Sequence, residues 1–474
     1  MKLTKWILAL SLIIAFCLLF VGCAKNEEEP VESATESEST TETEGPQLLN
    51  LTIDGKDIGE YKIVYARSPL EQKISATGKT IGEDLKDYLI GENIAYDFDY
   101  QTAVRLQTLI QEKTGKTLTL VKDTEGTAEE LEILVGQTIG RPETAALQAT
   151  MPFDSYKCAM DGTRYVICGK EWGTTWHAVD AWEKLLTKTL KDGKTDLDMK
   201  TAGDLSGEYV MKKVACIGDS ITRGSQAVYA SSDVVKSWGR NSTEVAKIRD
   251  IYYEEYLAYP CVAQRNLWKD YIVHNLGEGG ARMSHGPNLW VDCEEYTECM
   301  SYSNRDDFAY DLALVMLGTN DAAVSGSATW SNNEKKAYLD ATRSLIAEVY
   351  DGSPGVQFVM MNVPHRCDCD RILAYDACAR AVQLETVQTL VAEGENIRLY
   401  DMERFTKENL TADASQEGVP GVDPLKLHED YYNIKQGAND TTHFNYNGYY
   451  VVGMEMATVM EHILNEGPKS DYLY

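Results

Sequence analysis

The stretch Lys-Lys-Val-Ala-Cys-Ile-Gly-Asp-Ser-Ile-Thr, residues 212–222, decides the fold expected for the second half of the chain. The run from Lys212 to Ile217 is short and apolar, which predicts a strand. A glycine, an aspartate and a serine follow at once, where a helix is predicted to start. Ligands bind at the carboxyl edge of open α/β sheets, so this order predicts that the hydroxyl of Ser220 lies at such an edge. Taken alone, Asp219 and Ser220 would be explained equally well as helix-capping residues.

Two further predicted strands also carry polar motifs at their carboxyl ends. The strand at 271–274 is followed by Asn-Leu-Gly-Glu-Gly-Gly, residues 275–280, and the strand at 311–317 by Gly-Thr-Asn-Asp, residues 318–321. Asp-Thr-Thr-His, residues 440–443, lies near the C-terminus. In chain order the motifs are therefore Gly-Asp-Ser, Asn-x-Gly-x-x-Gly, Gly-x-Asn-Asp and Asp-x-x-His.

These four motifs together closely resemble those of the SGNH (GDSL-type) hydrolases, a family of serine esterases, over residues 206–474. The resemblance implies a three-layer α/β/α sandwich on a parallel sheet. It also implies an enzyme that needs neither a metal nor an organic cofactor. For the oxyanion hole it implies three donors: the backbone N–H groups of Ser220 and Gly280, and the side-chain amide of Asn320. The adjacent Gly279 is an alternative to Gly280.

The residue types agree with acyl transfer, which needs a nucleophile, a base and a group that orients the base. We expect Ser220 to be the nucleophile and His443 the base. Asp440 lies three residues before His443, so one tight turn can bring its carboxylate to the imidazole. The residue two after the serine is Thr222, so the Gly-x-Ser-x-Gly elbow of α/β-hydrolases is absent.

Other interpretations of the same residues stay open at this point. The glycines at 277–280 resemble a dinucleotide fingerprint, although Arg282 stands where its third glycine belongs. Asp440 and His443 could instead be metal ligands, and so could the Cys-Asp-Cys run at 367–369.

Four residues are candidates for substrate contact. Arg282 and His285 follow the predicted oxyanion loop. Trp290 and Trp330 follow the second and third motifs, where they could form a rim that stacks on sugar rings. The alternative for both tryptophans is ordinary packing in the core or under a loop.

Residues 47–205 predict a separate, smaller α/β or α+β domain. Strands are expected at 61–65, 118–121 and 131–136, and a hairpin at 156–168 that turns at Asp161-Gly162. Helices are expected around Leu106 and over 177–190. The runs LQTLI (106–110), TGK (114–116) and EILVG (132–136) weakly resemble the accessory domain that precedes some bacterial glycoside hydrolases.

The N-terminus predicts export. Two lysines precede an apolar run at 6–20 that is too short for a comfortable membrane span. The run ends in Phe-Val-Gly-Cys, which resembles a bacterial lipobox and implies a signal peptide at 1–22 and lipidation of Cys23. An uncleaved anchor with an incidental cysteine is the alternative. Residues 23–46 predict a disordered acidic tether, because Glu, Ser and Thr dominate them and almost nothing there can be buried.

Composition limits the partners. The 474 residues carry a formal charge of −29, which argues against nucleic acid and against a polybasic membrane patch. The segments 225–256 and 410–438 are predicted insertions that shape the pocket. We expect a serine esterase, lipid-anchored to the outer face of a bacterial membrane, that hydrolyses carboxylic esters, above all O-acetyl esters, on polysaccharide or oligosaccharide. A lipase or lysophospholipase is the main alternative, and a catalytically silent carbohydrate-binding lipoprotein is another.

Overall fold

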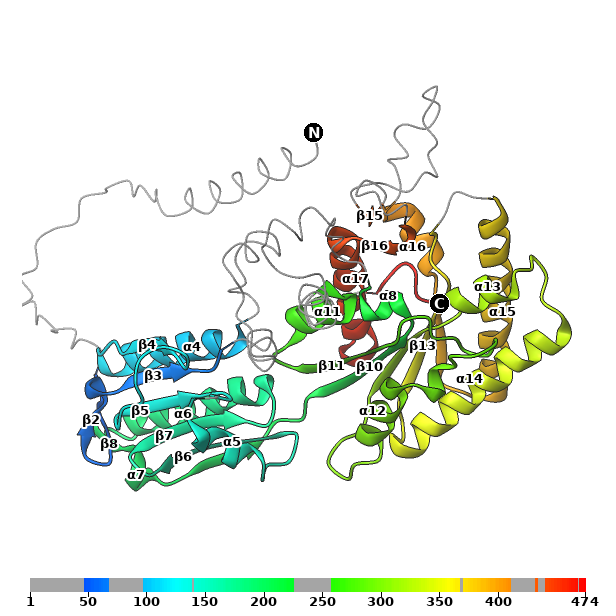
Figure 1. Ribbon diagram of the computed structural model, residues 1–474. Coiled ribbons are helices and arrows are strands. Elements are labelled where there is room, and N and C mark those ends of the chain that lie inside the picture. The colour runs from blue at the N-terminus through cyan, green and yellow to red at the C-terminus, as the bar shows by residue number, and fades with distance from the viewer. Residues whose placement is uncertain are drawn as a thin grey trace, which may run out of the picture. The chain divides into compact units, whose positions relative to one another are not determined.

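The computed structural model (Figure 1) describes residues 47–67, 97–138, 140–225, 257–366, 370–410, 431–433, 440–467 and 469–474. Residues Leu48–Tyr474 belong to one compact unit. The predicted signal peptide, Cys23 and acidic tether lie outside the described residues. So do nearly all of the two predicted insertions and the Cys-Asp-Cys run at 367–369.

The predicted parallel sheet forms in the second half of the chain. Its strand order is β11-β10-β12-β13-β14, and every neighbouring pair is parallel. The first strand along the chain, β10, therefore lies inside the sheet, flanked by the strands that carry the second and third motifs. The strands are β10 (Lys212–Gly218), β11 (Tyr271–Gly277), β12 (Leu312–Met316), β13 (Gln357–Met361) and β14 (Ile397–Tyr400).

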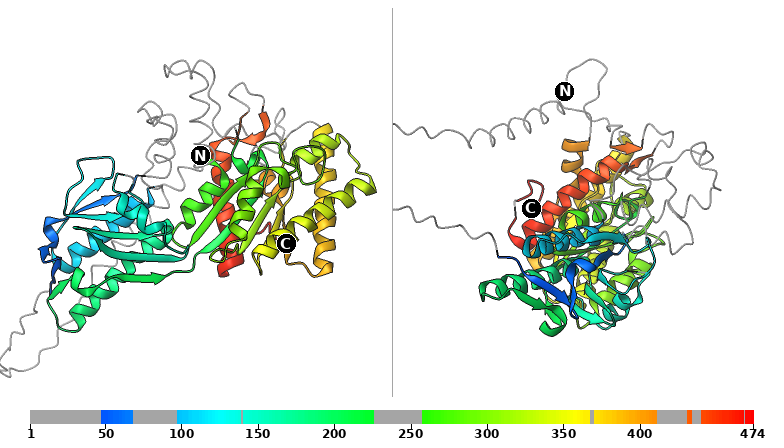
Figure 2. Two further views of the ribbon diagram at one scale, coloured as in Figure 1. Left: turned by 60° about the horizontal axis from the view of Figure 1, so that its bottom comes forward. Right: turned by 90° about the vertical axis from the view of Figure 1, so that its left-hand side faces the viewer.

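Alternate residues of these strands enter two different hydrophobic cores, as the two-residue period of a strand requires. Val214 and Cys216 belong to one core, whereas Ala215 and Ile217 belong to the other. One core includes residues of α11 (Tyr259–Leu267), α16 (Met402–Leu410) and α17 (Tyr446–Asn465). The other includes residues of α12 (Glu294–Ser303), α14 (Asn332–Gly352) and α15 (Asp370–Glu393). The predicted three-layer α/β/α arrangement is confirmed, and Figure 2 shows it from two further sides.

The first half of the chain forms a second, six-stranded sheet of order β4-β3-β5-β7-β6-β9. The predicted hairpin is present, since β6 and β7 pair antiparallel around Asp161 and Arg164. Helices α4 and α6 contribute to the core on one face of this sheet, and α5 packs on the other. The strands of this sheet are β3 (Lys62–Tyr65), β4 (Thr119–Lys122), β5 (Glu132–Val135), β6 (Ser155–Asp161), β7 (Arg164–Gly169) and β9 (Leu205–Glu208). The helices are α4 (Phe98–Thr114), α5 (Pro142–Gln148) and α6 (Trp172–Lys191).

A small sheet and two short helices complete this region. β1 (Asn50–Ile53) pairs antiparallel with β2 (Lys56–Asp57) and parallel with β8 (Asp196–Asp198). The short helices are η2 (Ile58–Glu60) and α7 (Met199–Ala202).

Side chains from the first region reach into the core of the second. Phe98 is fully buried, and its ring stacks on that of Trp268 with centroids 4.8 Å apart. Asp154 accepts hydrogen bonds from the Met211 backbone N–H at 3.1 Å and from the Lys213 ammonium at 2.7 Å. The entry into β10 is therefore held by contacts that cross the boundary expected at residue 205.

None of the helices in the described part of the chain is both long enough and apolar enough to cross a membrane.

Candidate active site

The ends of three neighbouring strands bring the first three motifs together. Gly218, the last residue of β10, pairs with Gly277 of β11 on one side and with Met316 of β12 on the other. The N–H of Glu278 also donates to the carbonyl of Gly218 at 3.0 Å. The segments that follow the three strands therefore leave the same edge of the sheet side by side, as the sequence predicted.

Two glycines allow this close approach. A Cβ on Gly218 would lie 1.9 Å from the Thr222 hydroxyl, and a Cβ on Gly277 would lie 2.2 Å from the backbone nitrogen of Arg223. Both contacts fall on α8 (Ser220–Arg223), a single helical turn that ends at Gly224 with φ +85°. Glycine at 218 and 277 thus lets the turn that carries the serine lie directly against the strand ends.

Ser220 and His443 meet across this edge. The imidazole Nε2 lies 2.7 Å from the serine Oγ, within hydrogen-bond distance. His443 lies on β16 (Asp440–Phe444), which pairs antiparallel with β15 (Tyr432–Asn433). The next residue, Phe444, is fully buried, with ring contacts to Tyr432 at 5.2 Å and Tyr449 at 5.4 Å. These contacts fix the strand that presents the histidine.

The backbone of Asp440 lies on the same strand, three residues before His443. Its side chain is outside the described part of the structure, so its role in orienting the imidazole stays a prediction.

The other two predicted oxyanion donors, Gly280 and Asn320, lie in the segments that follow β11 and β12. Gly280 has a φ of +81°, and a Cβ added there would meet no atom of the described residues within 4 Å. The Asn320 amide donates to the carbonyl of Ala281 at 3.0 Å and to the carboxylate of Asp219 at 3.4 Å. Asn320 lies in the first turn of α13 (Thr319–Ser325), beside the loop that contains Gly280. The Asn320 side chain is therefore held against the loop that contains Gly280. Its longer contact, to Asp219 at 3.4 Å, is the one that must give way when the amide donates to an oxyanion.

Residues 216–451 match the model of the GDSL-like Lipase/Acylhydrolase family. The chain contains a GDSL-like acylhydrolase domain. The protein is accordingly a carboxylic ester hydrolase, and the match runs from β10 into α17, through all four motifs.

Several solved structures are similar to the acylhydrolase domain. An aryl esterase from M. smegmatis is 13% identical, with a TM-score of 0.33, over 53% of this chain and 100% of that one. A carbohydrate acetylesterase family member from Sinorhizobium meliloti is 18% identical, with a TM-score of 0.31, over 54% and 99%. A family two carbohydrate esterase from Clostridium thermocellum, in complex with cellohexaose, is 16% identical, with a TM-score of 0.34, over 55% and 66%. The search of curated proteins found no significant match.

Asp219 is a carboxylate of this domain to which the sequence analysis gave no role beyond capping. It is fully buried, and it accepts the Ile221 N–H at 2.9 Å as well as the Asn320 amide. Burial raises the pKa of Asp219 to about 6, against the opposing effects of the Ile221 N–H, His443 and Arg366. Asp219 thus connects the turn that carries Ser220 to the predicted oxyanion amide of Asn320.

Of the four residues predicted to contact substrate, the two tryptophans are buried, and Arg282 and His285 lie on the loop that follows Gly280. Trp290 and Trp330 are 1% and 5% exposed, and the indole N–H of Trp290 donates to the Leu276 carbonyl at 3.0 Å. Their burial favours the packing interpretation over a sugar-stacking rim. His285 stacks on Trp330 with ring centroids 4.4 Å apart, and Arg282 donates to the carbonyls of its own loop.

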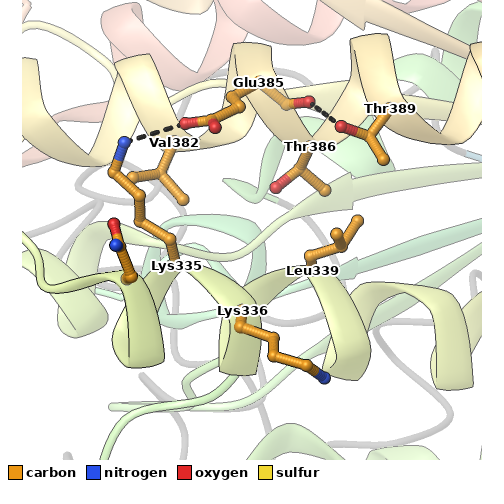
Figure 3. Close-up of a pocket in the computed structure, with 8 residues that line it drawn as sticks. Lys335, Lys336, Leu339, Val382, Glu385, Thr386 and Thr389 are labelled. Carbon is orange, nitrogen blue, oxygen red and sulfur yellow. Dashed lines mark hydrogen bonds and ion pairs between the residues drawn. The ribbon is translucent and has the colours of Figure 1, made fainter.

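A cavity of about 240 Å³ lies where this loop meets α14, and Arg282 and Trp290 help to line it. A second cavity, of about 270 Å³, lies between α14 and α15 (Figure 3). Its lining includes Lys335 and Glu385, whose side chains pair at 2.9 Å, but none of the predicted site residues. We assign the chemistry to the sheet edge because Ser220, Asn320 and His443 gather there.

Sequence reasoning also missed a buried ion pair behind α13. Arg366 and Asp376 are 6% and 0% exposed and form two hydrogen bonds at 2.8 and 2.9 Å. Arg366 also donates to the carbonyl of Thr319 at 3.4 Å. The sequence analysis gave neither residue a role, because neither lies in one of the four motifs. Among the described residues, no group of three or more His, Cys, Asp or Glu side chains is arranged to hold a metal ion.

Proposed function

We propose that this protein is an exported, lipid-anchored serine esterase that removes O-acetyl groups from carbohydrate. The observation that carries the mechanism is the 2.7 Å contact between Ser220 Oγ and His443 Nε2. A neutral imidazole nitrogen at this distance can take the hydroxyl proton as the oxygen attacks a carbonyl carbon.

The proposed reaction has two halves. Ser220 attacks the ester carbonyl while His443 takes its proton, and the tetrahedral oxyanion forms next to Gly280 and Asn320. The imidazolium then gives the proton to the leaving alcohol, which departs and leaves an acyl group on the serine oxygen. Water, deprotonated by His443, attacks this acyl-enzyme and releases the free acid and Ser220. We assign to Asp440 the role of holding the imidazole in the required tautomer.

Charged side chains beside the oxyanion loop favour a hydroxyl-rich substrate over a long acyl chain. Arg223 pairs with Glu278 at 3.3 Å, and the two side chains are 35% and 33% exposed. Burial, with Glu295 close by, raises the pKa of the Glu278 carboxyl. Sugar hydroxyl groups can exchange hydrogen bonds with such side chains, whereas a fatty acyl chain would desolvate them without compensation. The predicted signal peptide and acidic tether favour a polymer outside the cell.

The proposal is tested by measuring acetate release from a panel of acetylated plant polysaccharides. p-Nitrophenyl acetate and a long-chain ester are assayed alongside, for wild type and Ser220→Ala. We expect the wild type to deacetylate at least one glycan and the variant to lose this activity. Turnover of the long-chain ester alone would replace the carbohydrate substrate with a lipid. Absence of turnover, together with binding of glycan, would indicate a silent binding protein.

A further inference from the structure

We infer that Asp321 is a positioning residue that holds the oxyanion loop in its working conformation. This inference rests on the proposed role of Ser220 as nucleophile and of Gly280 as an oxyanion donor. Asp321 is the last residue of the Gly-x-Asn-Asp motif, and none of the catalytic steps above uses it.

The carboxylate of Asp321 is fully buried and receives three successive backbone N–H groups. Met283 N–H donates to Oδ2 at 2.9 Å, and the N–H groups of Ser284 and His285 donate to Oδ1 at 2.9 and 3.0 Å. The Ser284 hydroxyl and His285 Nδ1 lie 3.3 and 3.2 Å from the same oxygen. Three consecutive backbone N–H groups are satisfied by this one buried side chain, so the cluster fixes the backbone of residues 283–285.

The adjacent residue, Asn320, fixes the loop at a second point. Its amide donates to the Ala281 carbonyl at 3.0 Å, while the Ala281 N–H donates back to the Glu278 carbonyl at 3.1 Å. The loop therefore runs from the end of β11 at Gly277 to an anchor formed by two consecutive residues of α13. Gly279 and Gly280 lie between these fixed ends.

Fixing both ends matters because glycines do not hold a direction by themselves. Gly280 has a φ of +81°, and no atom of the described residues lies within 4 Å of a would-be Cβ, so none of their side chains packs against that side of Gly280. The direction of its N–H must therefore come from the anchored residues around it. Oxyanion donors are effective when they already point at the place where charge develops. Asp321 supplies this preorganisation without touching the substrate.

The test compares Asp321→Asn with wild type on p-nitrophenyl acetate. The carboxamide turns an NH2 group toward backbone donors, so the loop should loosen. We expect kcat to fall about 10–100-fold and KM to change less than about twofold, because the lost interaction is made in the transition state. Asp311→Asn is the matched control. Asp311 accepts the Lys213 N–H at 2.8 Å at the opposite end of β12, and its variant should keep kcat within about twofold of wild type.

Hydrogen–deuterium exchange of the peptide covering 278–290 provides a readout that does not need activity. In Asp321→Asn its exchange should rise about tenfold or more while the central strands stay protected. If Asp321→Asn does not fold, Asp321→Glu replaces it, because this variant keeps a carboxylate on a longer arm. We expect Asp321→Glu to show the lower kcat and the faster loop exchange that are expected of Asp321→Asn. An unchanged kcat, or faster exchange spread over the whole domain, would overturn the inference. Ser220→Ala in the same assay separates the two claims: if it stays active, the proposed mechanism itself fails.

Discussion

At the residue scale, the site is built from buried carboxylates that face backbone N–H groups. Asp219 and Asp321 are both fully buried, and each accepts from at least one main-chain donor. Each also follows or precedes a residue with a proposed chemical role, Ser220 or Asn320. The Gly-Asp-Ser and Gly-x-Asn-Asp motifs thus each combine a residue of proposed chemical role with a buried carboxylate beside it.

The raised pKa of Asp219 predicts how stability depends on pH. Burial raises this pKa from 3.8 to about 6, so ionisation costs free energy in the folded state. The stability that the fold gains from keeping Asp219 protonated is fully present below pH 3.8 and is lost as pH rises through about 6. Asp219→Asn resembles the protonated form at every pH. We expect wild type to lose about 2–3 kcal/mol of unfolding free energy relative to this variant between about pH 4 and pH 7.5. Urea denaturation of both proteins measures this, and a difference independent of pH would contradict the environment described for Asp219.

Removing the Asn320 amide tests the oxyanion assignment. Asn320→Ala should lower kcat about 100–1,000-fold, equivalent to about 3–4 kcal/mol of transition-state stabilisation, with little change in KM. Steady-state kinetics on p-nitrophenyl acetate measure both quantities. A variant with normal kcat would remove Asn320 from the oxyanion hole.

At the element scale, the turns after the strands are what the sequence predicted best. The apolar runs predicted β10, β11 and β12 because helices cover both faces of this parallel sheet, so its strands are buried on both sides. The sequence did not predict that α8 would be a single turn. So short a helix adds little dipole, and donors at this edge therefore act as individual N–H groups.

Substitution by alanine should have different effects at two glycines of the same motif, Gly277 and Gly280. At Gly277 a Cβ would lie 2.2 Å from the Arg223 nitrogen, so Gly277→Ala should destabilise the fold by about 2–4 kcal/mol. At Gly280 the space is open and the strain of a positive φ costs only about 1–2 kcal/mol. Gly280→Ala should therefore stay folded but lose activity, because its methyl group occupies the space proposed for substrate. Thermal unfolding together with kinetics checks this, and equal behaviour of the two variants would contradict it.

At the scale of the whole molecule, the sequence predicted strands and helices in both regions. It did not predict β9, β13 or β14, nor the contacts between the two regions. Periodicity assigns a buried face to each element without naming the partner that covers it. Phe98 illustrates this limit, because its ring stacks on Trp268 from a distant part of the sequence. The burial of Trp290 and Trp330 was likewise undecided from sequence, since an aromatic residue after a strand fits a rim or a core equally well.

These contacts predict that the acylhydrolase domain depends on the first region. A chain that begins at residue 206 would lose Phe98, which covers Trp268, and Asp154, which pairs with Lys213. We expect it to unfold at a lower temperature than the chain that begins at residue 47, by about 5 °C or more. Differential scanning calorimetry of both proteins measures the difference, and equal melting temperatures would show that the regions are independent.

The central claim, that Ser220 is the nucleophile, is tested most directly by covalent trapping. The protein is incubated with a fluorophosphonate, which reacts with activated serine hydroxyls, and the modified residue is located by peptide mass spectrometry. We predict one adduct, on Ser220, that is absent from Ser220→Ala and still forms in the nearby control Ser225→Ala. An adduct on a different residue, or no adduct on a folded protein that hydrolyses p-nitrophenyl acetate, would contradict the account.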